Sequence, residues 1–430
     1  MSKFKQYKHL SLSKTHKEVL ESWKETDIFN QSIEDRKGAP PFTFYEGPPS
    51  ANGMPGIHHV IARTIKDLFC RYKTLQGFHV NRKAGWDTHG LPVELAVEKE
   101  LEITKEDIGS TISIEDYNKA CRTNVMKYKE SWENITEEMG YWVDMENPYL
   151  TYDNKYIESV WWLLAKMHKK GLLYKGHTIQ PFSPKAGTGL STHELNQPGC
   201  YRDVKDTSAI AQFKVIKNEN SSILFRKTNN DIYFLAWTTT PWTLPSNTAL
   251  AVGKKIDYLL VETLNQYTGK AITVIVAKEL ATKYFGPENA GLKFEEYEVG
   301  KKNLPYKFIA EFKGSRLEGI RYEQLLPYVQ PKDGDSFRVI LADFVTTEDG
   351  TGIVHLAPSF GADDNRVAKQ NGIGSLTLVN KQGRFVDEVT DFAGLYVKDE
   401  FYSEEEEKPK LSADIQIVIK LKEENLCFKT

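Results

Sequence analysis

The sequence predicts an α/β protein in which part of a doubly wound parallel sheet precedes a β-rich module. Residues 42 to about 178 alternate strand-like runs with amphipathic helical segments, as in strands joined by crossover helices. From about residue 180, strand-like runs separated by glycine, proline and asparagine turns predominate. In the first part, ligands are expected at the carboxyl ends of the strands.

Size and composition indicate a soluble globular protein of two or three domains. The chain has 430 residues, of which 40% are apolar and 27% charged. It has no run of 18 apolar residues and no apolar secretory core near its start, so we expect no membrane span. The four cysteines show no Cys-x-x-Cys spacing, which argues against a disulfide framework and a cysteine zinc site and fits the cytoplasm. The net charge of −3 is unlike that of a general nucleic-acid binder.

The first elements are a helical lead-in, a short strand and a long helix. Residues 1–40 form the lead-in, with Val19, Leu20 and Trp23 on one side. Residues 42–44 alternate like a strand that Gly47 ends, and Gly77 lies where the C-cap of the long helix belongs. The apolar residues of that helix, spaced four, three, four and three, are Ile61, Ile65, Leu68, Tyr72 and Leu75.

The long helix opens with His58 and His59 directly after a turn rich in glycine and proline. Such a turn brings backbone N–H groups and the positive end of the helix dipole together. The two imidazoles add donors for the same anion, so the pattern predicts a phosphate site. The alternative is a structural turn with two surface histidines.

Two further helices are expected before the β-rich part. Ser113 and Asp116 form a capping-box-like start for one long helix, and the second helix stops at Gly171. The Trp161-Trp162 pair of the second helix is expected in the core. The first helix carries Tyr117, Cys121, Val125, Tyr128, Trp132, Ile135 and Met139, and the second carries Tyr156, Val160, Leu163, Leu164 and Met167.

Five runs are expected as strands of the β-rich part: residues 207–216, 232–240, 271–277, 338–345 and 352–358. The acidic run at residues 403–410 is expected to be an exit linker or an exposed loop.

Two motifs resemble a known family. FTFYEGPPSANGMPGIHHVIARTIKD (residues 42–67) is similar to the first signature of the class I aminoacyl-tRNA synthetases, and GWDTHGLPVE (residues 85–94) is similar to the second block of their isoleucyl members. A valyl member would carry a GTDHAG-like block there, and a leucyl member a GWDAFGLP-like one. The resemblance extends over nearly the whole chain. It implies a lead-in (1–40), the first half of a Rossmann catalytic domain (41–178), an inserted β-rich editing domain (179–400) and an exit segment returning to the catalytic domain (401–430).

The first signature departs from the family pattern. The usual His-x-Gly-His aligns with Gly56, Ile57, His58 and His59, so that the first histidine and the glycine have changed places. Gly56, which lacks a Cβ, still allows close approach to a nucleotide.

By this resemblance the complete enzyme would activate isoleucine with ATP and transfer it to tRNA(Ile). His58 and His59 would donate to ATP phosphates, and Gly47, Pro48 and Gly56 would shape the substrate pocket. Asp87 would accept the substrate ammonium; alternatively it is an N-cap or loop aspartate. Mg²⁺ would arrive with ATP, and no protein-bound zinc is expected, because residues 181–195 lack cysteine.

Two later motifs are similar to the family's editing signatures: WTTTPWTLPSN (237–247) and GTGIVHLAPSFGADD (350–364). Editing has a physical reason, because isoleucine and valine differ by one methylene, worth about 1–3 kcal/mol in an apolar pocket, for which the isoleucyl enzyme is itself the standard example. Threonines before a turn can also reflect β propensity alone, and a histidine after a strand can be a satisfied core residue. The resemblance implies that Thr238, Thr239 and Thr240 hold the terminal adenosine and water, with Asn247 on the same loop, that His355 sets pocket size, and that Asp364 binds the α-amino group.

The family's Lys-Met-Ser-Lys-Ser loop is not found in these residues. We therefore expect the N-terminal part of a longer synthetase, not competent for activation alone, monomeric and cytoplasmic, with isoleucine, ATP and tRNA(Ile) as its partners. The alternatives are a non-catalytic tRNA-binding fragment and a valyl-tRNA synthetase.

Overall fold

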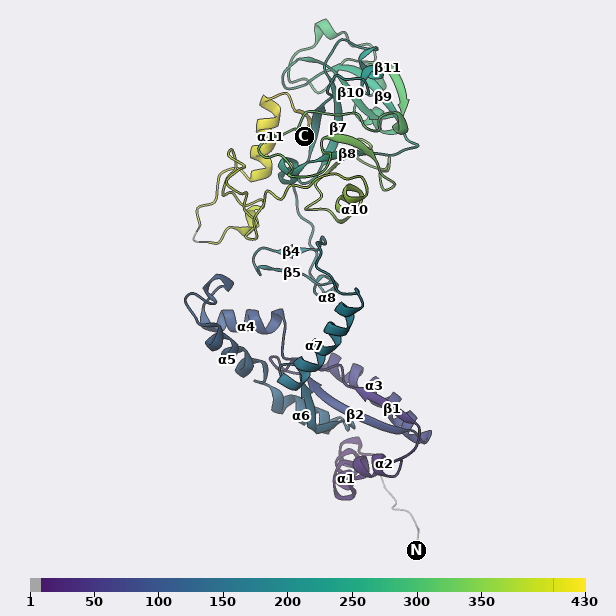
Figure 1. Cartoon of the computed structure of the whole chain (residues 1–430), viewed down its shortest axis with the longest axis vertical. Coiled ribbons are helices and arrows are strands. Elements are labelled where there is room, and N and C mark those ends of the chain that lie inside the picture. The colour runs from purple at the N-terminus through teal and green to yellow at the C-terminus, as the bar shows by residue number, and fades with distance from the viewer. Residues whose placement is uncertain (1–8, 405) are drawn as a thin grey trace. The chain divides into compact units, whose positions relative to one another are not determined.

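The computed structural model describes residues 9–404 and 406–430 of the chain. The chain divides into two compact units, Met1–Lys175 and Gly176–Thr430 (Figure 1). The finer four-part division from the sequence stays a prediction. Within the described residues, no helix combines the length and the apolar character needed to cross a membrane.

The first unit is built on a three-stranded sheet of order β1-β2-β3 in which both pairings are parallel. This confirms the parallel α/β pattern expected for residues 42–178. Strand and helix alternate around it, as the purple and blue ribbons of Figure 1 show. The strands are β1 (Pro41–Tyr45), β2 (His79–Trp86) and β3 (Asp144–Leu150); the helices are α1 (Leu12–Thr26), α2 (Ile28–Glu34), α3 (Ile57–Leu75), α4 (Leu91–Leu101), α5 (Ile114–Val125), α6 (Lys129–Glu138) and α7 (Asn154–Lys169).

The predicted helical lead-in consists of two helices, α1 and α2, which are separated at Asp27 by a left-handed backbone (φ 46°). Trp23 attaches α1 to the unit, since its ring meets that of Trp142 edge-on at 5.1 Å and the Arg71 guanidinium lies 4.9 Å from it. Residues 1–8 of the lead-in lie outside the described residues.

The single long helix predicted after Ser113 is wrong, because the structure has two helices there, α5 and α6. The chain leaves helical geometry at residues 126–128, where the N–H of Tyr128 donates to the carbonyl of Ala51 at 2.9 Å. This contact with the turn after β1 replaces an intrahelical hydrogen bond. A tertiary partner therefore overrides a continuous helical pattern.

The apolar faces of α3 and α7 lie open in this structure. Helix α3 ends before Gly77, whose φ of 90° confirms the expected left-handed termination. Trp161 and Trp162 of α7 are 68% and 58% exposed, so the prediction that this pair lies in the core is wrong for the described residues. The exposed apolar residues of α3 are Ile57, Ile61, Ile65, Leu68, Phe69, Tyr72 and Leu75.

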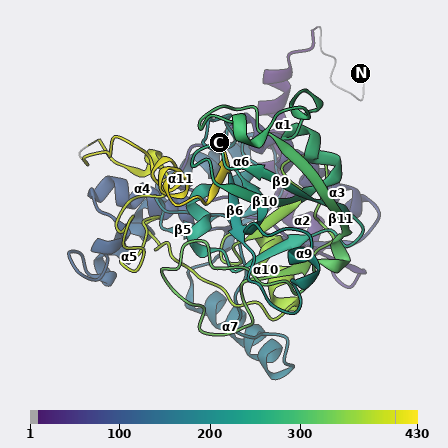
Figure 2. The same ribbon diagram turned by 90° about the horizontal axis from the view of Figure 1, so that it is seen from above.

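The second unit is β-rich, as predicted, and contains two main sheets. One has the order β11-β9-β10-β7-β6-β14 and the other β12-β8-β13; a two-stranded ribbon joins β4 to β5. The larger sheet is mostly antiparallel, with one parallel pairing between β10 and β7 (Figure 2). The strands are β4 (Phe182–Ser183), β5 (Thr188–Gly189), β6 (Ala209–Lys214), β7 (Ile232–Thr238), β8 (Ala249–Val252), β9 (Asp257–Leu264), β10 (Ala271–Ala277), β11 (Tyr306–Lys313), β12 (Arg338–Leu341), β13 (Ile353–Leu356) and β14 (Cys427–Lys429).

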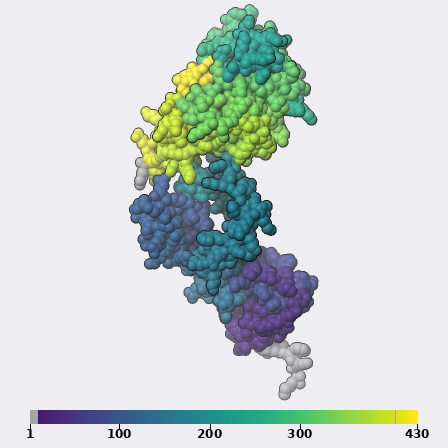
Figure 3. All heavy atoms as spheres, in the orientation of Figure 1, coloured from purple at the N-terminus to yellow at the C-terminus, as the bar shows by residue number. Residues whose placement is uncertain are grey.

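Helices α8 (Thr192–Leu195), α9 (Ser222–Phe225), α10 (Ala362–Gln370) and α11 (Ala413–Glu423) complete this unit. From β6 onward its residues pack into one dense body, teal to yellow in Figure 3, around an apolar core to which both main sheets contribute. All five predicted strand runs contain an observed strand.

The C-terminal residues belong to this core. Strand β14 pairs with β6, and Ile417, Leu421 and Cys427 are fully buried in the main apolar cluster. Residues 413–429 therefore contribute to the core of the second unit, and the exit segment predicted for residues 401–430 stays a prediction. Of the predicted acidic loop, residue 405 lies outside the described residues.

Candidate functional sites

In the first unit, residues of the two signature motifs lie at the ends of β1 and β2, next to the end of β3. Gly47 and Pro48 follow β1, and Asp87 follows β2. The N–H of Asp87 donates to the carbonyl of Pro49 at 3.0 Å, and the N–H of Thr151 donates to that of Trp86 at 3.2 Å. Among the described residues, the exposed Asp87 carboxylate accepts a single 3.3 Å hydrogen bond, from the His89 N–H. It remains available for a cationic group at the carboxyl edge of the sheet.

The turn after β1 is anchored by Glu46, which is 3% exposed. Its carboxylate pairs with Lys66 on α3 and accepts from the Tyr141 hydroxyl. Burial is the main cause, and the hydrogen bond to Glu46 the second, of a pKa of Tyr141 well above its usual value, so the phenol stays protonated as a donor. These contacts fix the position of the residue that directly precedes Gly47.

At the start of α3, the N–H of Gly56 donates to Nδ1 of His59 at 2.9 Å. Burial, and then the neighbouring His58, lower the pKa of His59. A neutral ring that accepts at Nδ1 carries its proton on Nε2, which makes His59 a directed donor. The two histidine rings lie 3.8 Å apart, and the His59 ring meets that of Trp132 at 4.7 Å.

Gly56 and His58 are sterically matched. A Cβ at residue 56 would lie 2.8 Å from the His58 ring, so any side chain there would displace that imidazole. The exchange of glycine and histidine relative to the usual signature is thus a paired change. It leaves the backbone of Gly56 open to a close ligand.

In the second unit, four side chains form a polar row from the end of β7 to β13. Thr238 Oγ1 accepts from the Thr240 N–H at 3.0 Å, and the two hydroxyls lie 3.3 Å apart. The Thr240 hydroxyl lies 3.4 Å from that of Thr243, which in turn is 3.2 Å from Nε2 of His355. The structure therefore brings together the threonine and histidine motifs, 112 residues apart at this bond. Thr239 is exposed on the same loop.

His355 is buried on β13, whose residues pair antiparallel with β8. Burial lowers its pKa to about 4, so the ring is neutral near pH 7. Its Nδ1 has no hydrogen-bond partner among the described residues. The ring therefore depends on Thr243 for its polar contact.

Asp364 lies in the first turn of α10, half-buried, and its Oδ2 accepts from the Ala357 N–H at 2.9 Å. Burial raises the pKa of this carboxyl group. Gly361 makes room for it, because a Cβ there would lie 2.8 Å from the Asp364 carboxyl carbon. The carboxylate thus folds back onto the end of the β13 motif.

Asn247 is 1% exposed, and the fold uses its whole amide group. Nδ2 donates to the carbonyls of Ala249 and Leu356 at 2.9 and 3.4 Å, and Oδ1 accepts from the Tyr322 hydroxyl at 2.7 Å. Asn247 thus ties the threonine loop to β13 and holds no polar atom free for a ligand.

A cavity of about 400 Å³ lies beside the row and is shared by the two motifs. Trp242 of the first motif and Phe360 of the second meet edge-on at 5.0 Å in its wall. Lys381 and Lys398 add positive charge, while the predicted threonines, His355 and Asp364 are not among its lining residues. The cavity combines aromatic faces with cations, which suits a nucleotide.

Two functional candidates escaped the sequence analysis. Thr243 lies three residues after Thr240, and this spacing brings side chains together in a 3-10 helix. The spacing is the sequence feature that could have identified Thr243 as a site residue. Asp414 reaches the same loop from 172 residues away, so no local pattern pointed to it.

These arrangements are those of a class I aminoacyl-tRNA synthetase. Residues 18–380 match the family described as tRNA synthetases class I (I, L, M and V), and the chain belongs to this family.

Within the family, the chain is similar to proteins named isoleucine–tRNA ligase. One from Cytophaga hutchinsonii is 58% identical, covering 98% of this chain and 39% of that protein. One from Bacteroides fragilis is 56% identical, covering 99% of this chain and 39% of the relative. The chain thus spans about two fifths of the length of the curated relatives it matches. The match to a solved P. knowlesi cytosolic leucyl-tRNA synthetase editing domain covers 40% of this chain and 69% of that one, at 13% identity and a TM-score of 0.29.

Proposed function

We propose that the chain is part of an isoleucine–tRNA ligase that carries half of the ATP and isoleucine site and a hydrolytic editing unit. The identity of 56–58% to proteins of that name over nearly the whole chain supports the proposal. The valyl alternative has no such support among these relatives. The substrates would be isoleucine, ATP with Mg²⁺, and tRNA(Ile).

For activation, His59 would donate from Nε2 to an ATP phosphate, beside the N–H groups that open α3. Gly56 would allow the nucleotide close to the backbone, and Gly47 and Pro48 would shape the pocket wall. Asp87 would bind the substrate ammonium. These groups bind and orient charge, which is how phosphoryl chemistry is chiefly catalysed.

For editing, the single observation that carries the proposal is the bond between Thr243 and His355 next to the shared cavity. Water would add to the ester carbonyl of Val-tRNA(Ile), the bond from that carbon to the ribose oxygen would break, and the ribose oxygen would take a proton. Thr238 and Thr240 would orient the water, and Asp364 would hold the free ammonium of the valyl group.

The test uses the purified 430-residue chain with Val-tRNA(Ile) and Ile-tRNA(Ile). We expect release of valine and little release of isoleucine, and Asp364→Ala is expected to abolish this preference or the activity itself. A chain that binds both tRNAs but hydrolyses neither would instead be the non-catalytic tRNA-binding fragment.

We further propose that the protein acts in the cytoplasm as a monomer. Four free cysteines among the described residues are in keeping with a reducing compartment.

A further inference from the structure

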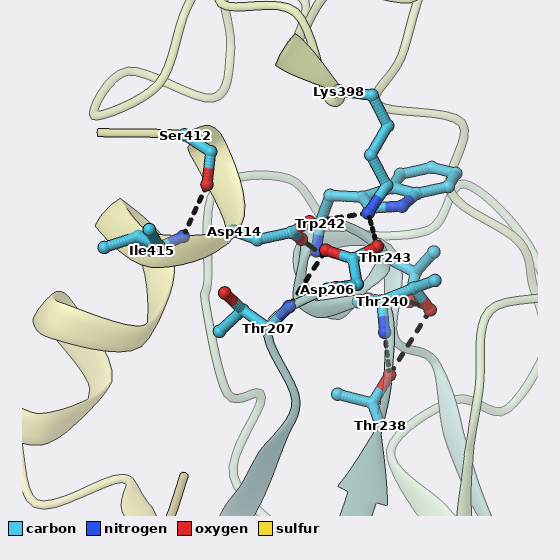
Figure 4. Close-up of polar contacts among 10 residues, drawn as sticks. All are labelled: Asp206, Thr207, Thr238, Thr240, Trp242, Thr243, Lys398, Ser412, Asp414 and Ile415. Atoms are coloured by element: carbon cyan, nitrogen blue, oxygen red, sulfur yellow. Dashed lines mark hydrogen bonds and ion pairs between the residues drawn. The ribbon is translucent and has the colours of Figure 1, made fainter. Parts of the chain in front are cut away.

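A buried carboxylate joins α11 to the loop that carries the threonines. Asp414 lies in the first turn of α11, and its side chain is 3% exposed. Its Oδ1 accepts from the backbone N–H of Trp242 at 2.8 Å (Figure 4). The two residues are 172 positions apart, so the contact is made only when the unit folds.

This hydrogen bond caps the 3-10 helix Pro241–Ser246 from outside. Pro241 has no N–H, so the N–H of Trp242 is the first donor at this helix end, and a carboxylate is the favoured partner there. Thr240 precedes the helix and Thr243 lies within it. Holding the Trp242 backbone in place therefore also positions the hydroxyls of Thr240 and Thr243, the second of which contacts His355.

The second oxygen of the carboxylate holds a cation beside the cavity. Asp414 Oδ2 pairs with Nζ of Lys398 at 2.8 Å, and the same ammonium pairs with Asp206 (Figure 4). Lys398 and Trp242 both line the cavity. Each oxygen of Asp414 thus holds a residue of the cavity wall: Oδ1 binds the backbone of Trp242, and Oδ2 binds the side chain of Lys398.

We propose that Asp414 is a positioning residue for the hydrolytic site: it holds the Trp242 backbone so that Thr240 and Thr243 face His355. The inference rests on the proposed editing function. Asp414 itself touches neither the water nor the ester.

The test compares Asp414→Ala with Asp414→Asn in the 430-residue chain, using Val-tRNA(Ile). Alanine removes the acceptor, and because small misplacements of catalytic groups cost up to about 100-fold, kcat is expected to fall ~10–100-fold with KM within about threefold. Asparagine keeps an acceptor oxygen of the same size but loses the ion pair with Lys398. It is expected to keep kcat within about threefold of wild type, although its unfolding midpoint falls.

A matched control is Asp391→Asn, which breaks another link to α11. Asp391 pairs with Lys420 of α11 at 3.0 Å and accepts from the Tyr328 hydroxyl at 2.6 Å, without contact to the threonine loop. This variant is expected to keep wild-type kcat. Loss of kcat in the control, in proportion to lost stability, would reduce Asp414 to a stabilising residue and overturn the proposal.

Deuterium exchange of the peptide covering residues 238–247 gives a readout that needs no catalysis. Exchange is expected to quicken in Asp414→Ala and to stay slow in Asp414→Asn and Asp391→Asn. If wild type hydrolyses no Val-tRNA(Ile), the editing function fails, and exchange still decides the positioning. Should Asp414→Ala not fold, Asp414→Glu displaces the acceptor by one methylene and must show the same loss of kcat and faster exchange; unchanged values overturn the proposal.

Discussion

Thr243→Val isolates the bond that joins the two halves of the candidate hydrolytic site. Valine keeps the shape of threonine but removes the hydroxyl, which lies 3.2 Å from Nε2 of His355 and donates to the Thr240 carbonyl at 2.8 Å. The Thr243 N–H still donates to that carbonyl at 3.0 Å. The loss therefore falls mainly on the histidine.

The magnitude follows from the burial of the ring. His355 is 9% exposed, and its Nδ1 already lacks a partner among the described residues, so valine at residue 243 leaves both ring nitrogens unsatisfied. A buried polar group without a partner costs about 1–3 kcal/mol. We expect Thr243→Val to lower the free energy of unfolding of the second unit by that amount. We also expect slower hydrolysis of Val-tRNA(Ile), because the hydroxyl that joins Thr240 to His355 is lost.

A double-mutant cycle with His355→Phe measures the effect. Urea unfolding is followed for wild type, both single variants and the double variant. Removing both polar partners together costs less than the sum of the single losses, so a coupling of about 1 kcal/mol is expected. Additive losses, or a Thr243→Val variant as stable and active as wild type, would refute the claim that His355 depends on Thr243.

Two further predictions concern buried ionisable groups. Burial lowers the pKa of His355 to about 4, so between about pH 6.5 and 4 the unfolded chain binds a proton that the folded chain does not, and the free energy of unfolding should fall over this range by up to about 3 kcal/mol. Urea midpoints measured across this range should depend less on pH in His355→Gln than in wild type. An equal pH dependence in both proteins would contradict the assignment. Glu46→Gln removes the negative charge that pairs with Lys66, whose side chain is 32% exposed, and keeps an acceptor for the Tyr141 hydroxyl. The free energy of unfolding of the first unit, measured by chemical denaturation, should fall by about 1 kcal/mol. No loss would show that Glu46 does not anchor the turn after β1.

Local patterns predicted the elements well where a segment's neighbours are near in sequence. The spacing of apolar residues from Ile61 to Leu75 predicted α3 and its termination, and strand-like runs separated by turn residues predicted β7, β10 and β13. The break between α5 and α6 could not be read in this way, because it comes from Tyr128 donating to Ala51 on another segment. The exposed position of Trp161 was missed for a related reason: helical spacing shows that a face is apolar, not which residues cover it.

For the candidate hydrolytic site, motif order predicted that residues 237–247 and 350–364 would lie together, and the Thr243–His355 contact confirms their proximity. The role of each side chain was less accessible. Asn247 was predicted as a site residue, yet its amide is fully used by the fold, and Asp414 had no motif at all. Sites assembled from distant segments are visible to sequence reasoning only where one segment carries a recognisable pattern.

The pairing of β14 with β6 delays completion of the larger sheet during translation. Gln212 donates to the carbonyl of Asn425, 213 residues away, and Asn265 bonds to both Gln212 and Cys427. At translation speeds of about 5–20 residues per second, the ribosome needs ~10–40 s between these partners. Until then, Ile210 and Ala211 on the edge of β6 lack their β14 partners on the nascent polypeptide, and an unpaired strand edge is a natural point for chaperone engagement.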